Sequence, residues 1–287
     1  MVSSAGVRKH ILAAFDELPP KQRQLARFFL NNEDIVAFAS ANEVGERVGT
    51  SAATVVRFCR ALGYQGYTDL QAAIRTQFPQ YRTAVQKMAD RMANGDMMDD
   101  LPTRVAQANA QNVQETMSQV TTENLTRAVS AIISARKIRI FGSGLSTSAA
   151  VLAEFALRSL GLSARACLGS RASQAIEISQ LTERDVVIVI SIWRYLRETI
   201  EAAQSAHTVD ATCIALTDSP VAPVARIADH VFVATTEGAA HSRSLTGIIS
   251  LIDLLSAAIA AEKPHQSMEA LRRLDKLYRE NGILVSE

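Results

Sequence analysis

Three short stretches of the sequence carry hydroxyls, glycines and arginines at points where apolar runs end. "FGSGLSTSAA" begins at Phe141, "SIWRYLRET" at Ser191 and "HSRSLTG" at His241. The first places hydroxyls and backbone amides at the start of a predicted helix, which favours an anion. The other two add arginines, whose guanidinium groups hold carboxylates and phosphates with paired hydrogen bonds. The three stretches together predict a site for a small anion.

Two other chemistries are weaker interpretations of the same residues. The first stretch resembles a dinucleotide-binding loop but has Thr147 in place of the third glycine, and the later "ACLGSR" supplies no acid for a ribose. We therefore expect no nicotinamide cofactor and no other cofactor. The three cysteines, Cys59, Cys167 and Cys213, are scattered among apolar residues. They predict reduced core thiols, neither a disulfide nor a metal site.

Catalysis needs a base near the ligand, and Glu237 and His241 are the one Glu and His pair close together at a predicted strand end. They precede a helix, where four-residue spacing does not align side chains. We predict no catalytic residues and a protein that is not an enzyme. A sugar-phosphate isomerase remains an alternative, and so does a protein-interaction module.

The elements that must position these stretches alternate between strands and helices. Short β-branched runs separated by helical segments predict five strands at Lys137–Phe141, Ala164–Leu168, Asp185–Ser191, Ala211–Thr217 and His230–Ala234. This rhythm is typical of a three-layer αβα domain around a five-stranded parallel sheet. In such sheets ligands lie outside the carboxyl ends of the strands, where all three stretches fall.

The N-terminal part is helical, with no strand pattern up to about Phe78. Ser40 and Glu43 have capping-box spacing and predict a helix from Ala41 to about Val48. Gly49 supplies a turn, Ser51 caps a second helix at 52–62, and a glycine follows it. Two short helices joined by a tight turn form a helix-turn-helix, whose second helix enters the major groove of DNA.

The exposed face of that second helix carries the candidate DNA-binding residues: Ser51, Ala53, Thr54, Arg57 and Arg60. The small side chains permit the helix to approach the bases closely. Arg57 can form hydrogen bonds with a guanine edge, and Arg60 can contact a phosphate of the DNA backbone. Residues 47–75 hold four arginines and one aspartate, a local basic excess that the net charge of +1 hides. A helical interaction module with solvated arginines is the alternative at this point.

A family resemblance favours the DNA-binding interpretation. "LPPKQRQLARFFLNN" and "ATVVRFCRALGYQGY" closely resemble the helix-turn-helix domain of RpiR/MurR bacterial transcription regulators. The remainder looks like the sugar isomerase (SIS) domain that those regulators carry. The resemblance implies a regulator that senses a metabolite, usually a phosphorylated sugar. We predict a DNA-binding domain at 1–79, a connecting segment with a helix at 80–121, and an SIS-type effector-binding domain at 122–287.

The second ligand loop departs from the family pattern, which has serine, glycine and threonine where this chain has Trp193, Arg194 and Leu196. An arginine clamp with Trp193 stacking on the ligand, an ordinary phosphosugar site, and a purely structural loop in which Trp193 fills the pocket all remain open. The expected effector is a phosphosugar or a sugar acid. The candidate effector-binding residues are Ser143, Gly144, Ser146, Ser191, Trp193, Arg194, Arg197 and Arg243.

The sequence also predicts how the protein assembles and where it is found. A single helix-turn-helix reads few base pairs, so we expect a homodimer or homotetramer on a palindromic double-stranded operator. Candidate self-association surfaces are the SIS helices and the methionines of the connecting segment: Met88, Met92, Met97 and Met98. With no predicted signal peptide or membrane span, we expect a cytoplasmic protein and no membrane partner.

Overall fold

The computed structural model describes residues 5–75, 85–86, 88–89, 100–192, 194–239 and 242–283. The chain divides into two compact units, with the division between residues 97 and 98, inside the predicted connecting segment. Each unit has its own hydrophobic core. Among the described residues no helix is both long and apolar enough to cross a membrane.

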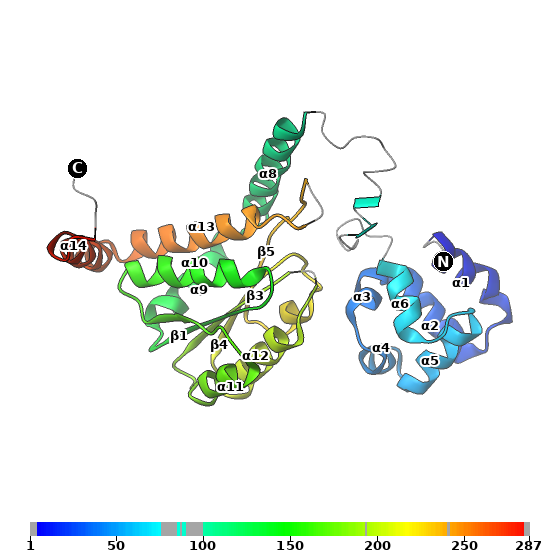
Figure 1. Cartoon of the computed structure of the whole chain (residues 1–287). Helices are drawn as coiled ribbons and strands as arrows, with labels where there is room; N and C mark the ends of the chain where they lie inside the picture. Colours follow the sequence, from blue (N-terminus) through cyan, green and yellow to red (C-terminus); the bar gives the residue numbers. More distant parts are fainter. Residues whose placement is uncertain are drawn as a thin grey trace. The chain divides into compact units, whose positions relative to one another are not determined.

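The first unit is built of helices alone in the part that the structure describes (Figure 1). They are α1 (Ala5–Ala14), the 3-10 turn η1 (Phe15–Glu17), α2 (Pro20–Asn31), α3 (Glu33–Phe38), α4 (Ala41–Val48), α5 (Ala52–Ala61) and α6 (Tyr67–Arg75). Phe29 on α2 meets Phe58 on α5 edge to face, with 5.1 Å between ring centroids. Tyr67 and Gln71 donate to carbonyls at the end of α3, satisfying groups that a helix terminus leaves unpaired.

The second unit contains a parallel sheet whose strand order is β2-β1-β3-β4-β5 (Figure 1). The strands are β1 (Ile138–Gly142), β2 (Ala164–Ala166), β3 (Val186–Ser191), β4 (Thr212–Thr217) and β5 (His230–Val233). Residues of β1 and β3 are buried throughout, as expected for strands covered on both faces. The five predicted strands are therefore present. β2 ends two residues earlier than predicted, because this edge strand pairs with β1 alone.

Helices cover both faces of this sheet and confirm the three-layer prediction. The helices are α8 (Leu101–Ser118), α9 (Thr122–Ser134), α10 (Ser146–Ser159), α11 (Arg171–Ser179), α12 (Arg197–Thr208), α13 (Thr246–Glu262) and α14 (Pro264–Glu280), with a 3-10 turn η3 (Pro223–Arg226). One core joins the sheet to α9, α10 and α13, and the other joins it to α11, α12 and η3. Helix α8 packs on α13, and α14 follows α13 after a short turn.

Candidate functional site

The two helices of the candidate DNA reader are set by local hydrogen bonds. Ser40 and Glu43 form a capping box: the Glu43 amide lies 3.2 Å from Ser40 Oγ, and the Ser40 amide 2.6 Å from Glu43 Oε2. Gly49 ends α4 with φ of 70°, a left-handed conformation that glycine adopts readily. Ser51 Oγ accepts the Thr54 amide at 3.3 Å and caps α5. The structure uses the capping residues that the sequence predicted.

One face of α5 is open to solvent and carries the predicted base readers. Arg57 Nη2 donates to Thr54 Oγ1 at 2.9 Å, and the hydroxyl oxygens of Thr54 and Ser51 are 3.0 Å apart. Ala53 is exposed beside this row, which leaves space for a base edge to approach. Arg60 lies near the end of the helix, where its Nε donates at 3.2 Å to a main-chain carbonyl of the following turn. These five residues therefore share one solvent-facing surface at the start and outer side of α5.

Arg75, which contributes to the basic excess of this region, serves the fold. Its Nε donates to the Ala37 carbonyl at 2.5 Å, and its guanidinium lies over the Phe38 ring, 5.6 Å from the centroid. This arginine holds α6 against α3. The basic character of the candidate DNA surface rests on the other arginines.

The second unit has a switch in strand order between β1 and β3, where a ligand is expected in sheets of this kind. A hollow of about 180 Å³ lies there, lined by Gly142, Ser143, Gly144, Thr147, Leu168, Gly169, Arg171, Gln174 and Glu198. A Cβ at Gly142 would lie 2.6 Å from the Ser146 carbonyl oxygen, so only glycine permits this tight exit from the strand. Ser143 and Gly144 thus line the hollow. Ser146 does not line it and is buried, with 2% of its surface exposed.

Sequence reasoning missed two charged residues of this hollow, Arg171 and Glu198. Arg171 follows Ser170, whose Oγ accepts the Ser173 amide at 3.2 Å and caps α11. Its guanidinium pairs with Glu201 of α12, and its side chain is 65% exposed. The available signal was the capping serine Ser170, because it marks a helix N-terminus after a strand, a place that favours an anion. Glu198 in the first turn of α12 carried no comparable signal.

The exit from β3 contains a buried hydroxyl, that of Ser191. Ser191 is 3% exposed, and its Oγ has no hydrogen-bond partner among the described residues. Arg194 and Arg197 are exposed and do not line the hollow beside β1. Tyr195 donates from Oη to Asp218 Oδ1 at 2.8 Å, which ties this loop to the end of β4. Trp193 lies outside the described residues.

The connection from β5 to α13 contains a half-buried arginine whose terminal nitrogens have no acceptor among the described residues. Both terminal nitrogens of Arg243, Nη1 and Nη2, are shielded from solvent and have no hydrogen-bond partner among the described residues. A buried cation without an acceptor is costly, so such a group calls for an explanation. The neighbouring Ser244 Oγ accepts the Thr246 amide at 3.2 Å, just ahead of α13. The anion-binding role that the sequence predicts for Arg243 stays a prediction.

Metal and thiol chemistry find no support among the described residues. No group of three or more His, Cys, Asp or Glu side chains there could hold a metal ion. The three free cysteines are buried, and burial raises the pKa of Cys59 and Cys213 to about 12 and that of Cys167 to about 11. Of the Glu and His pair considered for catalysis, Glu237 is exposed and His241 lies outside the described residues.

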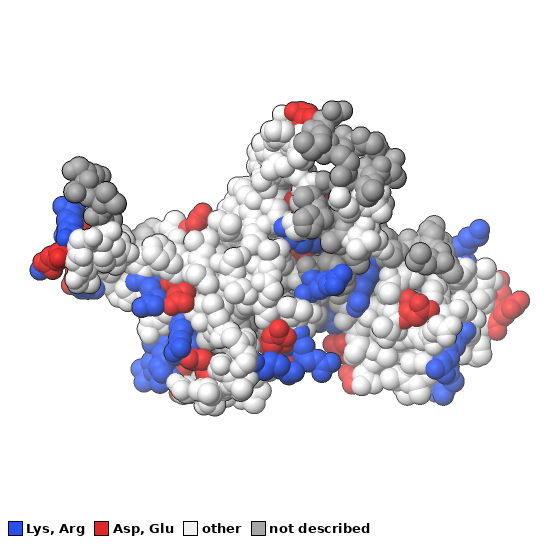
Figure 2. All heavy atoms as spheres, viewed as in Figure 1, with Lys and Arg blue, Asp and Glu red and all other residues white. Residues whose placement is uncertain are grey.

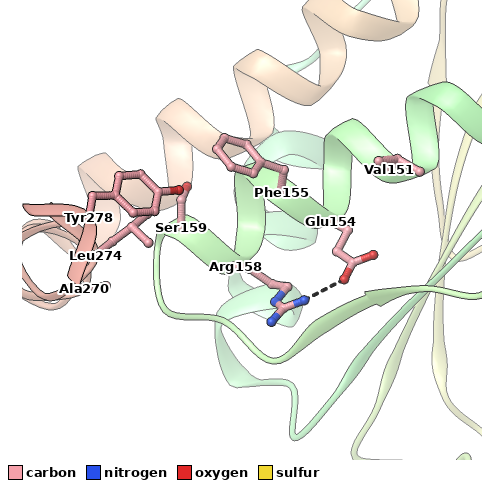
Figure 3. Close-up of a pocket in the computed structure, with 8 residues that line it drawn as sticks. All are labelled: Val151, Glu154, Phe155, Arg158, Ser159, Ala270, Leu274 and Tyr278. Atoms are coloured by element: carbon pink, nitrogen blue, oxygen red, sulfur yellow. Dashed lines mark hydrogen bonds and ion pairs between the residues drawn. The ribbon is translucent and has the colours of Figure 1, made fainter. Parts of the chain in front are cut away.

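A second hollow, of about 470 Å³, lies between α10 and α14 (Figure 3). Its lining includes Phe155, Leu274 and Tyr278, and the only ion pair drawn there joins Arg158 to Glu154. Phe155 is 61% exposed, and Leu277 on α14 is 53% exposed. Figure 2 shows basic and acidic side chains close together on α14, at the left of the view. This surface is apolar with a mixed-charge rim, unlike the polar hollow at the strand ends.

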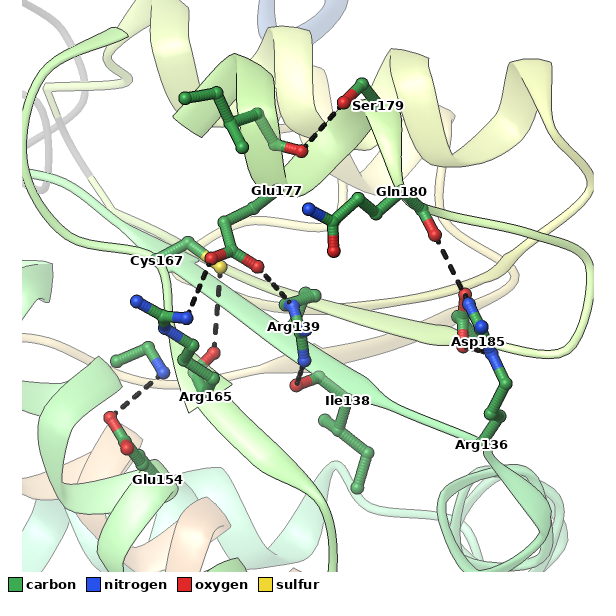
Figure 4. A network of polar contacts seen from close by, with 12 residues as sticks. Arg136, Ile138, Arg139, Glu154, Arg165, Cys167, Glu177, Ser179, Gln180 and Asp185 are labelled. Atoms are coloured by element: carbon green, nitrogen blue, oxygen red, sulfur yellow. Dashed lines mark hydrogen bonds and ion pairs between the residues drawn. The ribbon is translucent and has the colours of Figure 1, made fainter. Parts of the chain in front are cut away.

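Beneath α11 lies a charged network that supports the β1–β2 edge of the sheet (Figure 4). Glu177 accepts from Arg139 Nε at 2.7 Å and pairs with Arg165 at 3.0 Å. The two arginines are register partners on adjacent strands, so one carboxylate separates two cations. Arg136 pairs with Asp185 at 2.7 Å close by. None of these residues has a buried side-chain nitrogen or oxygen atom without a hydrogen-bond partner in the described structure.

Comparison with known proteins agrees with both units. Residues 5–81 match the model of the helix-turn-helix domain of the rpiR family, and residues 131–261 match the SIS domain. The sugar isomerase domain of an RpiR transcription factor from Sphaerobacter thermophilus is 37% identical; the match covers 62% of this chain and 99% of that domain, with a TM-score of 0.60. The chain belongs to the RpiR family. It is a helix-turn-helix transcriptional regulator with an SIS domain.

Further relatives of this RpiR-family regulator match along most of its length. A helix-turn-helix transcriptional regulator of Caldanaerobacter subterraneus subsp. tengcongensis is 27% identical over 85% of this chain and 86% of its own. The Vibrio vulnificus NanR protein, solved in complex with ManNAc-6P, is 22% identical over 94% of this chain and 97% of its own, with a TM-score of 0.69. At that identity the likeness to NanR concerns the fold.

Proposed function

We propose that this regulator binds a palindromic operator sequence-specifically and that a small anionic metabolite at the strand ends of the SIS domain sets its affinity for DNA. Residues 1–79 read the DNA, residues 80–121 connect, and residues 122–287 bind the effector. In the DNA-reading part, Ser51, Ala53, Thr54 and Arg57 face base edges while Arg60 contacts the backbone. A regulator of this kind acts in the cytoplasm, where DNA and effector meet.

The observation that carries the effector proposal is that Arg243 Nη1 and Nη2 are shielded from solvent and have no hydrogen-bond partner among the described residues. Leaving a buried cation unpaired costs free energy that an anion would recover on binding. The shielded hydroxyl of Ser191 supplies a second unsatisfied group at the same edge of the sheet. A phosphate or a carboxylate accepts from both kinds of donor. Ser143, Gly144, Ser146, Trp193, Arg194 and Arg197 remain the other candidate contacts.

The effector class we propose is a phosphosugar or a sugar acid. NanR, which shares this fold, was solved with ManNAc-6P, a precedent for such a ligand in this architecture. The chain's own arginines supply charge for either anion. No catalytic step is proposed for the bound ligand.

The experiment that tests this function measures DNA binding by fluorescence anisotropy on DNA upstream of the protein's own gene, with unrelated competitor DNA and at two salt concentrations. Sugar phosphates, including ManNAc-6P, and sugar acids are then added one at a time. The proposal expects competitor-resistant binding and at least one anion that changes the affinity. Binding without sequence preference would contradict the DNA half, and turnover of a sugar phosphate by the protein would favour the isomerase alternative.

We further propose that the protein works as a homodimer or a homotetramer through the apolar groove between α10 and α14. The occupant is a second copy of the chain. The lining of the groove includes one pair of opposite charge, Arg158 with Glu154, and α14 carries another, Arg273 with Glu269. A surface with both signs can face its own copy without like-charge repulsion. Dimerisation would also present two recognition helices to the two halves of a palindrome.

A further inference from the structure

Three polar side chains on one face of α8 hold the segment that carries Arg243. Asn109, Asn112 and Thr116 follow one another at spacings of three and four residues, so they line up along the helix. Their partners lie in residues 235–246, between β5 and the first residue of α13. More than a hundred residues of sequence separate the two sides of these contacts.

The Asn112 carboxamide pairs with the backbone of Glu237 in both directions. Its Nδ2 donates to the Glu237 carbonyl at 2.7 Å, and the Glu237 amide donates to its Oδ1 at 3.1 Å. Asn112 is 1% exposed, so water does not compete for these bonds. The side chain pairs with this backbone as a neighbouring strand would, at a place beyond the end of β5 where none of the described strands pairs.

Thr116 and Asn109 extend this support in both directions along the segment. Thr116 Oγ1 accepts the Thr235 amide at 3.0 Å and is fully buried. A Cβ on Gly247 would lie 2.6 Å from the same oxygen, so the first turn of α13 packs closely against α8 at this point. Asn109 Oδ1 accepts from the Ser244 hydroxyl at 2.8 Å. Side chains of α8 therefore hydrogen-bond to residues 235–246 on both sides of Arg243.

We propose that Asn112, with Asn109, is a positioning residue that fixes the Arg243 segment on α8 and thereby couples the effector site to α8, the first described helix of the second unit. Arg243 needs its segment in one conformation to place a buried guanidinium on an anion. Helix α8 begins at Leu101, and α6 of the DNA-reading unit ends at Arg75. A ligand that binds one conformation of the segment better than another biases α8 in the same step.

The effector part of this inference rests on the proposed function, so the test has one arm without ligand. In the full-length protein, Asn112→Ala is compared with Gln111→Ala, a change at the adjacent, exposed position of α8. Hydrogen exchange is followed in residues 234–246. We expect at least tenfold faster exchange of the Glu237 amide in Asn112→Ala, because its acceptor is gone, and wild-type exchange in Gln111→Ala. Equal exchange in the two variants would overturn the positioning role.

The second arm measures coupling, which a merely structural residue would leave unchanged. DNA affinity is compared with and without saturating ManNAc-6P or whichever sugar phosphate of the panel acts on the wild type. Asn112→Ala should bind DNA within twofold of wild type without ligand and lose at least fivefold of the ligand's effect. An undiminished ligand effect overturns the coupling.

Two controls keep the outcomes distinct. Asn109→Ala, which removes the acceptor of the Ser244 hydroxyl at a half-buried position, takes the place of Asn112→Ala if that variant does not fold. A wild type that responds to no sugar phosphate or sugar acid would overturn the proposed effector class. The exchange comparison would then still decide whether Asn112 positions the segment.

Discussion

Arg57 Nη2 donates to Thr54 Oγ1 at 2.9 Å, three residues earlier on the outer face of α5. This bond holds a long, exposed side chain along the helix and aims its remaining donors at solvent. An arginine restrained in this way loses less conformational freedom when it binds a base edge.

Replacing Arg57 with alanine should weaken specific operator binding by about 1–3 kcal/mol, because a base-reading contact is lost. The affinity is measured by fluorescence anisotropy, with Arg127→Ala as the control. Arg127 is exposed on α9 and pairs with Glu123 in the second unit, so its loss should leave the operator affinity unchanged. Equal affinities of the two variants would remove Arg57 from the base readers.

Arg243→Met should abolish or weaken anion binding at least tenfold without destabilising the free protein. Without an anion, Arg243 Nη1 and Nη2 are buried with no partner among the described residues, and methionine removes the charge while keeping an unbranched, flexible side chain. The melting temperature should be unchanged or higher, and titration calorimetry should show the lost affinity. Arg184→Met, at an exposed position, is the control. A lower melting temperature with intact anion affinity would mean that Arg243 serves the fold.

A charge in the apolar groove should separate the copies of the chain. Phe155→Glu places a carboxylate at a 61% exposed position between α10 and α14, where burial against a second copy would desolvate it. Light scattering after size-exclusion chromatography should report a smaller assembly than the wild type. Ile176→Glu has the same exposure on α11 and should leave the assembly intact. An unchanged mass for Phe155→Glu would place the interface elsewhere.

Glu177→Gln should destabilise the second unit by about 3 kcal/mol. The side chain of Arg139 is 9% exposed, and removal of the carboxylate leaves its charge near Arg165 without compensation. Urea unfolding measures the loss. The matched control is Glu123→Gln, which breaks an ion pair whose side chains are 69% and 73% exposed and should cost less than about 1 kcal/mol.

Stability should fall on acidification. Burial raises the pKa of Asp185, but hydrogen bonds from Arg136 and Thr182 outweigh it and lower that pKa below its ordinary value. A depressed carboxyl pKa stabilises the folded state above the unfolded value of about 3.9, and this stability is lost as pH falls through the folded pKa. Burial also lowers the pKa of His230. Below about pH 6.5 the unfolded chain therefore binds a proton at this histidine more readily than the folded chain, which also lowers stability as the pH falls.

The pH effect is measured as melting temperature between pH 7 and pH 3. Asp185→Asn should be less stable than the wild type at pH 7 and should lose less stability on acidification. Asp253→Asn, at an exposed position of α13, should follow the wild-type curve. Parallel curves for Asp185→Asn and the wild type would show that Asp185 does not contribute to the acid sensitivity.

The sequence by itself determined the features that depend on neighbouring residues. Ser40, Glu43, Gly49 and Ser51 predicted both helices of the DNA reader, because caps and turns are hydrogen bonds between residues three or four positions apart. The five β-branched runs predicted the parallel sheet, since strands covered on both faces need continuous apolar residues. The family resemblance of "ATVVRFCRALGYQGY" added the regulator, which the match of residues 5–81 supports.

Only the tertiary structure decided which distant residues meet. The strand order brings Arg171 and Glu198 to the hollow beside β1, and no local pattern encodes strand order. That Arg243 Nη1 and Nη2 are buried with no partner among the described residues depends on what packs over them, a property of the folded chain. The Asn112 contact with Glu237 spans 125 residues, and a lone asparagine in a helix carries no sign of such a partner. Local hydrogen bonds and periodicity can be read along a chain, whereas burial and long-range pairing exist only once the chain has folded.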